Sequence, residues 1–328
     1  MRQVTVEVHP TGIGGTIFSS SVANQCNSNS ICIIDSELVV KMDQSLNVGA
    51  LIVRGSLEWN KASTNTNGTA QTLYLCAGYV AVEGNGSFSM EIQQIRQSAW
   101  IYIKDNGAQH PDLRVRGFGG VARENSDDNP IIDIQGRKLI RTWSLLSSPL
   151  LQGENTMKLM HNPTLMGWNE GDRIAIAPTE VRSTGSGQEF RISAISKSGI
   201  ITLSDSAQYN FDAEFYSPSQ SGKEPVLKSA EVVNLDRSII ITGDDFAQVP
   251  CENDLPEAVP GEQTSVLGCR CASFRTTCTV GLHTAQVRGG VMRIQNTRVE
   301  KCGQRGKDVV DSKILNNASH VFACCSFL

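Results

Sequence analysis

Five charged or ionisable residues in the second half of the sequence have side chains suited to sugar chemistry: Asp236, Arg237, Asp244, Asp245 and His283. If the ends of neighbouring strands bring them together, their carboxylates supply general acid and base catalysis on a glycosidic bond, or bind a calcium ion that orients an acidic sugar. A simpler alternative needs no function. Asp244 and Asp245 then form a turn by bonding to their own backbone, and Arg237 pairs with a neighbouring surface carboxylate. We favour this alternative.

A catalytic metal centre has little support. The five histidines stand at positions 9, 110, 161, 283 and 320, without the H-x-H or H-x-x-x-H spacing of a zinc site. Packing is therefore the expected role of His283, and no cofactor is expected beyond the calcium ion considered above.

The ten cysteines indicate an oxidising compartment, because a cytosolic enzyme of this length usually carries fewer. Cys26 and Cys32 flank a turn-rich segment and are a plausible disulfide pair, whereas Cys76 lies in a predicted strand as a buried free thiol. A segment rich in proline and glutamate, 249–278, is predicted to be a surface insertion. Either two disulfides or a zinc ion would explain its cysteines, and disulfides are favoured because the C-x-x-C spacing is missing. These cysteines are Cys251, Cys269, Cys271 and Cys278.

Three N-x-[ST] sequons, at Asn67, Asn85 and Asn317, lie in turn-like surroundings and are candidate glycosylation sites. They agree with an extracellular or cell-surface location. The first residues lack the apolar stretch of about 7–15 residues that marks a secretory signal, and no run is long enough to span a bilayer. We therefore expect a fragment of a longer secreted or membrane-anchored protein, in which any membrane contact comes through a segment absent from this chain. A cytosolic location is the alternative.

Composition indicates a folded protein rich in strands and turns. The 328 residues are 40% apolar and 19% charged, with 29 glycines. This is enough apolar material for a sizeable core, and the charged fraction is lower than in most soluble domains. The formal net charge of −4 offers no basic face, so nucleic acid is excluded as a partner.

Short runs of alternating apolar and polar residues, bounded by Gly, Asn or Ser, predict an all-β fold. The clearest are 37–43, 50–55, 72–84, 99–105, 173–177 and 199–205. Two later runs, 238–245 and 291–304, each join an apolar strand to a Gly or Asn corner, which is typical of one rung of a parallel β-helix. The four tryptophans lie in or beside apolar strands and are expected to pack in the core rather than stack on sugars. They are Trp59, Trp100, Trp143 and Trp168.

An ordered series of segments resembles the G8 (eight-glycine) domain family of extracellular proteins. The family includes fibrocystin and a transmembrane cell-surface hyaluronidase. The segments that carry the resemblance are 37–59, 73–88, 99–105, 142–146, 165–180, 188–205 and 229–245. The resemblance implies an N-terminal segment at 1–30, an eight-glycine domain at 31–180, and the start of a right-handed parallel β-helix at 181–328. The β-helix is expected to be cut short, since the histidine-bearing rung of the family is missing after Arg305.

The expected function is recognition of a glycan or an extracellular protein by a β-helix scaffold. The alternative is an enzyme that degrades a hyaluronan-type polysaccharide with the acidic residues and His283, which matches a Gly-x-His motif of the family. We favour the non-catalytic function, because the enzyme needs rungs that this sequence lacks. A purely structural segment of a larger receptor is a third interpretation.

Overall fold

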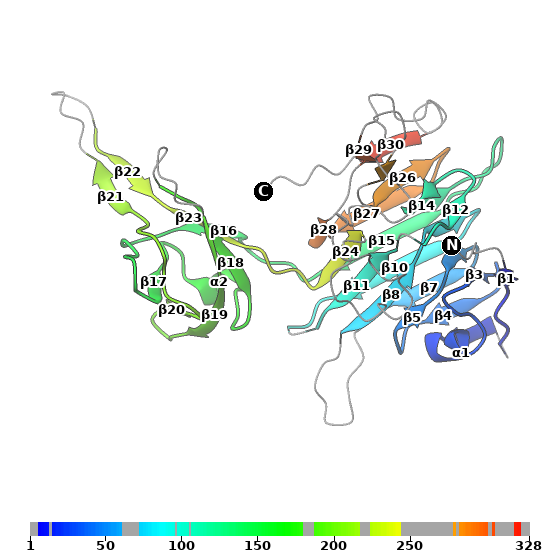
Figure 1. Ribbon diagram of the computed structural model, residues 1–328, viewed down its shortest axis with the longest axis horizontal. Coiled ribbons are helices and arrows are strands. Elements are labelled where there is room, and N and C mark those ends of the chain that lie inside the picture. Colours follow the sequence, from blue (N-terminus) through cyan, green and yellow to red (C-terminus); the bar gives the residue numbers. More distant parts are fainter. Residues whose placement is uncertain are drawn as a thin grey trace, which may run out of the picture. The chain divides into compact units, whose positions relative to one another are not determined.

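The computed structural model contains almost only β-strands, with two short helices among the residues that it describes (Figure 1). This bears out the all-β expectation. The described residues are 6–12, 15–60, 72–95, 97–104, 106–179, 187–216, 224–243, 278–279, 282–300, 304–305 and 318–322.

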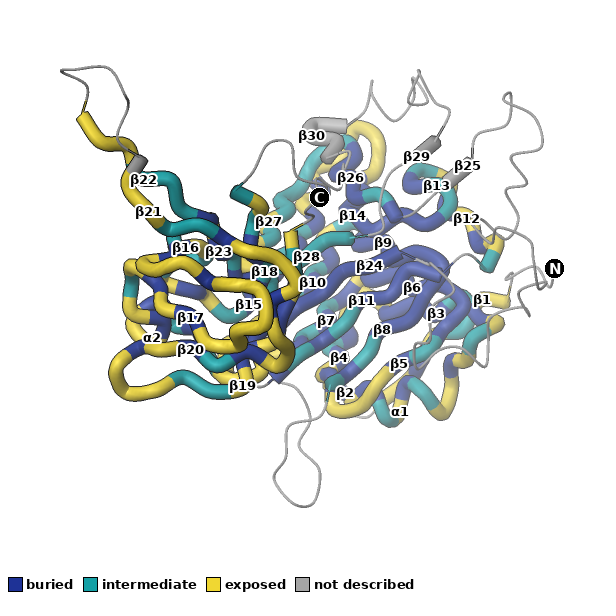
Figure 2. Tube along the Cα trace, turned by 60° about the vertical axis from the view of Figure 1, so that its left-hand side comes forward, coloured by how far each residue is buried: buried dark blue, intermediate teal, exposed yellow. Residues whose placement is uncertain are grey.

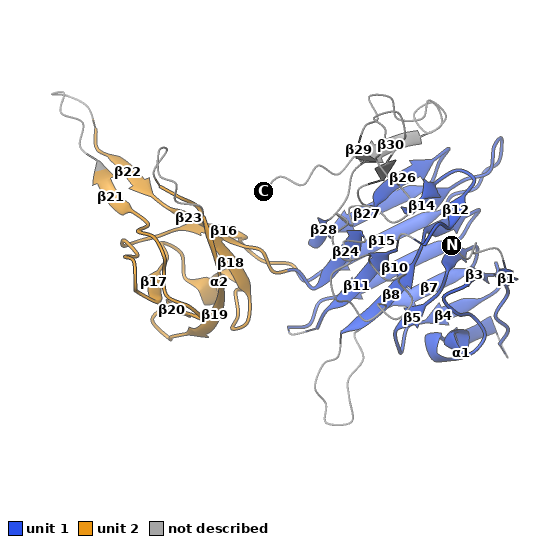
Figure 3. Cartoon of the chain, viewed as in Figure 1, with its two compact units in different colours: residues 1–137, 237–328 blue, residues 138–236 orange. Residues whose placement is uncertain are grey.

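Buried residues follow the strands in several separate clusters (Figure 2). The chain accordingly divides into two compact units (Figure 3). Unit 1 comprises residues 1–137 and 237–328, and unit 2 comprises residues 138–236. The boundary expected at 180/181 lies inside unit 2, and the one expected at 30/31 lies inside unit 1. Unit 2 is thus an insertion between two strands of unit 1, which the sequence analysis did not anticipate.

Among its described residues, unit 1 contains two small two-stranded sheets and three large ones, here named A, B and C. Neighbouring strands of the large sheets are parallel except for the last strand of sheet A. Sheet A contains β1 (Val6–Val8), β3 (Ser30–Ile34), β6 (Ala50–Val53), β9 (Val80–Glu83), β14 (Gly117–Val121), β26 (His283–Val287) and the antiparallel β30 (Ala318–Phe322). Sheet B contains β2 (Thr16–Phe18), β4 (Val39–Lys41), β7 (Ser56–Trp59), β10 (Ser87–Ile92), β15 (Ile131–Gly136) and β27 (Val291–Gln295). Sheet C contains β5 (Leu46–Asn47), β8 (Leu73–Ala77), β11 (Ala99–Ile103), β24 (Ile239–Gly243) and β28 (Thr297–Glu300).

From β3 to β28 the chain enters the sheets in the repeated order A, B, C, and we call each set of three successive strands a circuit. The five circuits are β3–β4–β5, β6–β7–β8, β9–β10–β11, β14–β15–β24 and β26–β27–β28. Each circuit therefore adds one strand to every sheet.

Register places like residues above one another in neighbouring circuits. In sheet C, for example, Leu75, Ile101, Ile241 and Val299 occupy equivalent positions in four successive strands. Because side chains alternate between the two faces of a strand, one row faces the interior and the next faces outward. The interior rows of all three sheets form one apolar core. Burying one such side chain contributes roughly 1.5–3 kcal/mol.

The outward face of sheet A carries a second apolar layer. Ile52, Tyr79 and Val121 of this layer are buried, and Leu113 packs with them. Leu113 belongs to an excursion between β11 and β14 that contains β12 (Gln109–His110) and β13 (Arg114–Val115). Both faces of sheet A are therefore covered where this excursion crosses it.

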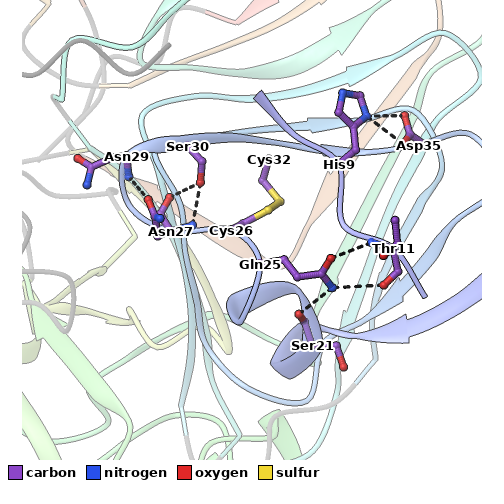
Figure 4. The surroundings of a disulfide bond; sticks show 10 residues. All are labelled: His9, Thr11, Ser21, Gln25, Cys26, Asn27, Asn29, Ser30, Cys32 and Asp35. Carbon is purple, nitrogen blue, oxygen red and sulfur yellow. Dashed lines mark hydrogen bonds and ion pairs between the residues drawn. A yellow bond between two sulfur atoms is a disulfide. The ribbon is translucent and has the colours of Figure 1, made fainter. Parts of the chain in front are cut away.

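The first circuits are closed at their N-terminal side by helix α1 (Ser19–Ala23), in which Val22 is fully buried. Beside it, Cys26 and Cys32 form the expected disulfide (Figure 4). The Gln25 side chain bonds to the backbone of both Thr11 and Ser21, which ties the preceding loop to the helix.

Unit 2 contains one antiparallel sheet with the strand order β16-β23-β18-β19-β20-β17. Its strands are β16 (Trp143–Leu145), β17 (Thr156–Lys158), β18 (Arg173–Ile176), β19 (Gln188–Ile195), β20 (Ile200–Leu203) and β23 (Glu231–Asn234). The helix α2 (Pro163–Met166) begins at Asn162, whose side chain accepts the Thr164 N–H, and ends at Gly167 in the left-handed conformation. A hairpin of β21 (Ala213–Tyr216) and β22 (Val226–Ser229) completes the unit, which has its own core around Trp168 and Ile174.

Two further expectations need correction. Cys76 is disulfide-bonded, not a free thiol. Trp59 and Trp168 do pack in cores, but Trp143 is 45% exposed under the Arg141 guanidinium, and Trp100 is half-buried on the outward face of sheet C. A tryptophan within an alternating run can lie on either face of its strand, so proximity to apolar residues did not determine its burial.

Candidate functional site

A polar groove of about 570 Å³ lies along unit 1, where strands of sheet A lead toward sheet B. Its lining comes mainly from the turns that follow β3, β6, β9, β14 and β26, together with one residue of the excursion that contains β12 and β13. The lining residues are Ser36, Arg54, Glu83, Gly84, Asn85, Asp112, Val121, Ala122, Arg123, Asp128 and Arg288. All five circuits contribute to it.

Glu83 is the centre of one charged group in this groove. Its carboxylate accepts a hydrogen bond from Arg54 Nε at 2.9 Å and one from His110 Nε2 at 2.9 Å. Burial raises the pKa of Glu83, but the hydrogen bonds from His110 and Arg54 outweigh it and hold this pKa below its usual range. Glu83 is therefore ionised at neutral pH.

His110 contacts Glu83 from the protein interior, since the His110 side chain is only 2% exposed. Its Nδ1 accepts the backbone N–H groups of Asp112 and Leu113, each at 3.1 Å, so its proton sits on Nε2 and is donated to Glu83. The His110 ring packs edge-on against the Tyr79 ring, with 5.3 Å between the ring centroids. Burial of the Tyr79 phenol, together with the nearby negative charge of Glu83, raises its pKa to about 12. Neutral His110 thus fixes both the Glu83 carboxylate and the turn that carries Asp112.

Arg288 forms the second charged group. It donates from Nη1 to Asp112 at 2.8 Å and from Nε to the Ala122 carbonyl at 2.7 Å. The hydrogen bond from Arg288 lowers the pKa of Asp112, so this carboxylate is also ionised at neutral pH. Arg288 therefore joins the excursion to the turn after β14.

Arg123 and Asp128 form the third group across a short loop. Arg123 donates from Nε and Nη2 to the two Asp128 oxygens at 2.8 and 2.9 Å, and its backbone N–H bonds to the same carboxylate. These bonds hold the pKa of Asp128 well below its usual range. The adjacent Asn129 N–H bonds to the Asn85 side chain at 3.0 Å, which links this loop to the turn after β9.

Unusual backbone conformations gather around the groove. Arg288, Arg114, Arg116 and Asn125 have positive φ angles of 64°, 61°, 58° and 55°, and Asn296 at the β27–β28 corner has the fifth such angle among the described non-glycine residues. Such conformations cost free energy, persist where the surroundings impose them, and cluster at functional sites. Arg288 lines the groove, Arg114 begins β13, Arg116 directly follows it, and Asn125 lies within the Arg123–Asp128 loop.

Those residues singled out in the sequence that the structure describes lie elsewhere. His283 begins β26 on the outward face of sheet A, where its Nε2 donates to the Leu113 carbonyl at 2.7 Å. It thereby supports the excursion that carries His110 and Asp112. Asp236 and Arg237 precede β24 of sheet C, and the Asp236 N–H bonds to the Asn234 side chain. Asp244 and Asp245 lie outside the described residues, so their grouping with His283 stays a prediction.

Among the proposed cysteine pairs, Cys26–Cys32 is present. The backbone of Cys278 lies in β25 (Cys278–Thr279), which pairs with β29 (Gln304–Arg305). Cys251, Cys269 and Cys271 fall outside the described residues, as do the sequons at Asn67 and Asn317. Asn85 is exposed and lines the groove.

Within the described part of the chain, no group of three or more His, Cys, Asp or Glu side chains is arranged to hold a metal ion. The same residues include no helix with the length and apolar character needed to cross a bilayer. Comparison of the sequence with models of known protein families, and with curated protein sequences, finds no match.

The sequence analysis did not identify the groove, although a local signal for it exists. At the end of a strand of sheet A, a valine is followed by a charged residue and a glycine in Val53-Arg54-Gly55, Val82-Glu83-Gly84 and Val287-Arg288-Gly289. The recurrence places a charge at this corner in three of the five circuits. It could be interpreted only once the three strands were known to share a sheet.

Proposed function

We propose that this chain is an extracellular or cell-surface protein of the eight-glycine type whose three sheets are the walls of a parallel β-helix, and whose groove binds a glycan. The repeated order of sheets A, B and C supports the β-helix, because each circuit adds one parallel strand to every wall. The Cys26–Cys32 disulfide agrees with an oxidising compartment.

The composition of the groove supports a glycan over a protein partner. Protein interfaces depend on aromatic and large apolar anchors that fill pockets in their partner. The lining has only Val121 and Ala122 as apolar members and no aromatic side chain. Its other side chains bear hydrogen-bond donors and acceptors at closely spaced positions, which suit the hydroxyl groups of a sugar. This polar lining is the observation on which the proposal rests.

The alternative function, an enzyme that degrades a polysaccharide, has weaker support. Glycosidic cleavage usually needs one carboxyl group that stays protonated near neutral pH beside a second one that is ionised. In the groove the pKa values of Glu83, Asp112 and Asp128 are all lowered. These three carboxylates are suited to accepting hydrogen bonds and unsuited to donating a proton, which supports recognition without catalysis.

The proposal is tested by screening the folded chain on an array of immobilised oligosaccharides. We expect selective binding to at least one sugar class, and a loss of roughly tenfold or more in affinity when Arg54 and Arg123 are replaced by alanine. Lys41→Ala is the control, because Lys41 is a half-exposed cation paired with Glu58 outside the groove. Absence of binding to every sugar, or equal binding by both variants, would contradict the proposal.

A further inference from the structure

The charges that line the groove balance one another. Its three arginines each pair with one carboxylate, as Arg54 with Glu83, Arg123 with Asp128, and Arg288 with Asp112. His110 adds no charge while its Nδ1 accepts two backbone N–H groups. The other lining residues are uncharged, so the lining as a whole has no net charge at neutral pH.

An acidic residue lies beside the groove. Glu124, next to Arg123 in sequence, acts electrostatically on Arg288 and favours its charged form. The whole chain carries a formal charge of −4. An acidic sugar would therefore approach carboxylates as closely as it approached guanidinium groups, and it would have to compete with Glu83, Asp112 and Asp128 for arginines that are already paired.

For an uncharged sugar, by contrast, the paired charges of the groove are available hydrogen-bonding groups. Each guanidinium has five N–H donors, and the ion pairs use only some of them. Each carboxylate keeps lone pairs that still accept hydrogen bonds. A paired arginine and carboxylate thus present a donor and an acceptor side by side, and a sugar hydroxyl donates and accepts. The exposed Asn85 and Ser36 extend this pattern without adding charge.

We infer that the groove takes an uncharged oligosaccharide and discriminates against acidic glycans, an inference that rests on the proposed glycan-binding function. The enzyme considered as the alternative in the sequence analysis would act instead on a hyaluronan-type polysaccharide, which carries a carboxylate on every second sugar. The ion pairs of the groove distinguish these two classes of ligand.

Titration calorimetry with defined hexasaccharides tests the inference. The neutral probes are cellohexaose, laminarihexaose and mannohexaose, and the acidic probes are hyaluronan and heparin hexasaccharides. We expect at least one neutral probe to bind roughly tenfold more tightly than either acidic probe, with an affinity that changes less than about twofold between about 50 and 300 mM NaCl. Tighter, salt-sensitive binding of an acidic probe would overturn the inference while leaving glycan recognition intact. Absence of binding to every probe would overturn both.

A gain of binding provides the sharper test, because misfolding does not produce it. In the double variant Glu83→Gln and Asp112→Asn the groove keeps its arginines and loses two negative charges. We expect this variant to bind hyaluronan hexasaccharide at least about fivefold more tightly than the unaltered chain. Glu58→Gln is the matched control, since it removes a carboxylate outside the groove, and it should leave this affinity unchanged. No gain in the double variant, or an equal gain in the control, would overturn the inference.

Discussion

The interior of unit 1 is covered at one end of its three sheets and half-exposed at the other. At the first end, Ile17 of β2 and Val22 of α1 close the apolar interior and are themselves buried. At the other end, β27 and β28 are the last strands of sheets B and C among the described residues. Their interior residues Met292, Ile294 and Val299 are only partly buried.

The chemical character of the interior changes along with its burial. In sheet A one interior row runs Ile34, Val53, Val82, Gly120 and Gln286 in successive strands. The row is aliphatic through three circuits and ends in a glycine and a buried amide. A stacked strand is stabilised by the layers on both of its sides, so the last layer contributes less burial and tolerates polar groups. Stability is therefore expected to fall from the first circuits to the last.

The largest expected difference comes from Ile134 and Ile294, which occupy the same interior row in the adjacent strands β15 and β27. Ile134 is fully buried, so Ile134→Ala should lower the free energy of unfolding of unit 1 by about 2–5 kcal/mol. Ile294→Ala removes the same atoms from a partly buried position and should cost less than about half as much. Hydrogen exchange of the sheet B amides, recorded at increasing urea concentrations, measures the loss of unfolding free energy in both variants.

Ile174→Ala serves as the control for this pair, because Ile174 is fully buried in the separate core of unit 2. It should leave hydrogen exchange in sheet B unchanged. Equal losses for Ile134→Ala and Ile294→Ala would show that burial does not decline toward the last circuit.

The next effect concerns the Cys26–Cys32 disulfide at the covered end. Closing a loop between cysteines six positions apart should stabilise the folded chain by about 2 kcal/mol. The double variant Cys26→Ala and Cys32→Ala should lose this amount, mainly as faster hydrogen exchange in β3 and α1. Both half-cystines are buried, so alanine introduces no new polar group. If the strands of the last circuit lost protection instead, the disulfide would not be what secures the first end.

A smaller effect is expected where the interior row turns polar. A methyl group on Gly120 would clash with Gln286 Nε2, which donates to the Gly289 carbonyl. Gly120→Ala should therefore displace this amide and destabilise unit 1 by about 1 kcal/mol. Combining it with Gln286→Ala should remove the clash, which gives a favourable coupling in a double-mutant cycle. Additive effects would mean that the two positions do not share one interior space.

The strands could be predicted from the sequence, but which strands pair with one another could not. Alternation in segments such as 50–55 and 99–105 reflects the two faces of a strand, and it is the same in parallel and antiparallel sheets. The repeat was hidden because the five strands by which the circuits enter sheet A begin at residues 30, 50, 80, 117 and 283, at unequal intervals. Rungs were consequently predicted only in 238–245 and 291–304, although the parallel sheets contain strands from Val6 onward.

The groove could not be predicted from the sequence for a related reason. Arg54 and Arg288 are 234 positions apart in sequence. They share a groove because β6, β9, β14 and β26 are four neighbouring strands of sheet A, and the two arginines follow the first and the last of these strands. The histidine favoured from the sequence, His283, supports the excursion, whereas His110, which had no motif around it, holds Glu83. Local patterns identified residues that matter for the fold, and long-range pairing determined which of them face the groove.

The smallest predicted effect concerns the charge of Asp43, which stabilises α1 at the covered end of unit 1. Asp43 accepts hydrogen bonds from the Ser20 backbone N–H and from the Ser19 and Ser20 hydroxyls, and so caps the start of α1. Burial raises the pKa of Asp43, but these bonds outweigh it and lower the pKa below its ordinary value of 3.8. A lowered folded-state pKa adds stability that is present above pH 3.8 and disappears as the pH falls through the folded value.

Acid should therefore weaken α1 more than β27 and reduce the difference between the two ends. The Asp43→Asn variant should lose under about 1 kcal/mol of protection in α1 at neutral pH, because an amide still accepts some of the same bonds. Once the native carboxyl is protonated, well below pH 3.8, the variant and the unaltered chain should become equal. Hydrogen-exchange protection factors, corrected for the intrinsic rate at each pH, make the comparison. A variant effect that persisted at the lowest pH would mean that shape and hydrogen bonding at Asp43, rather than its charge, secure the covered end.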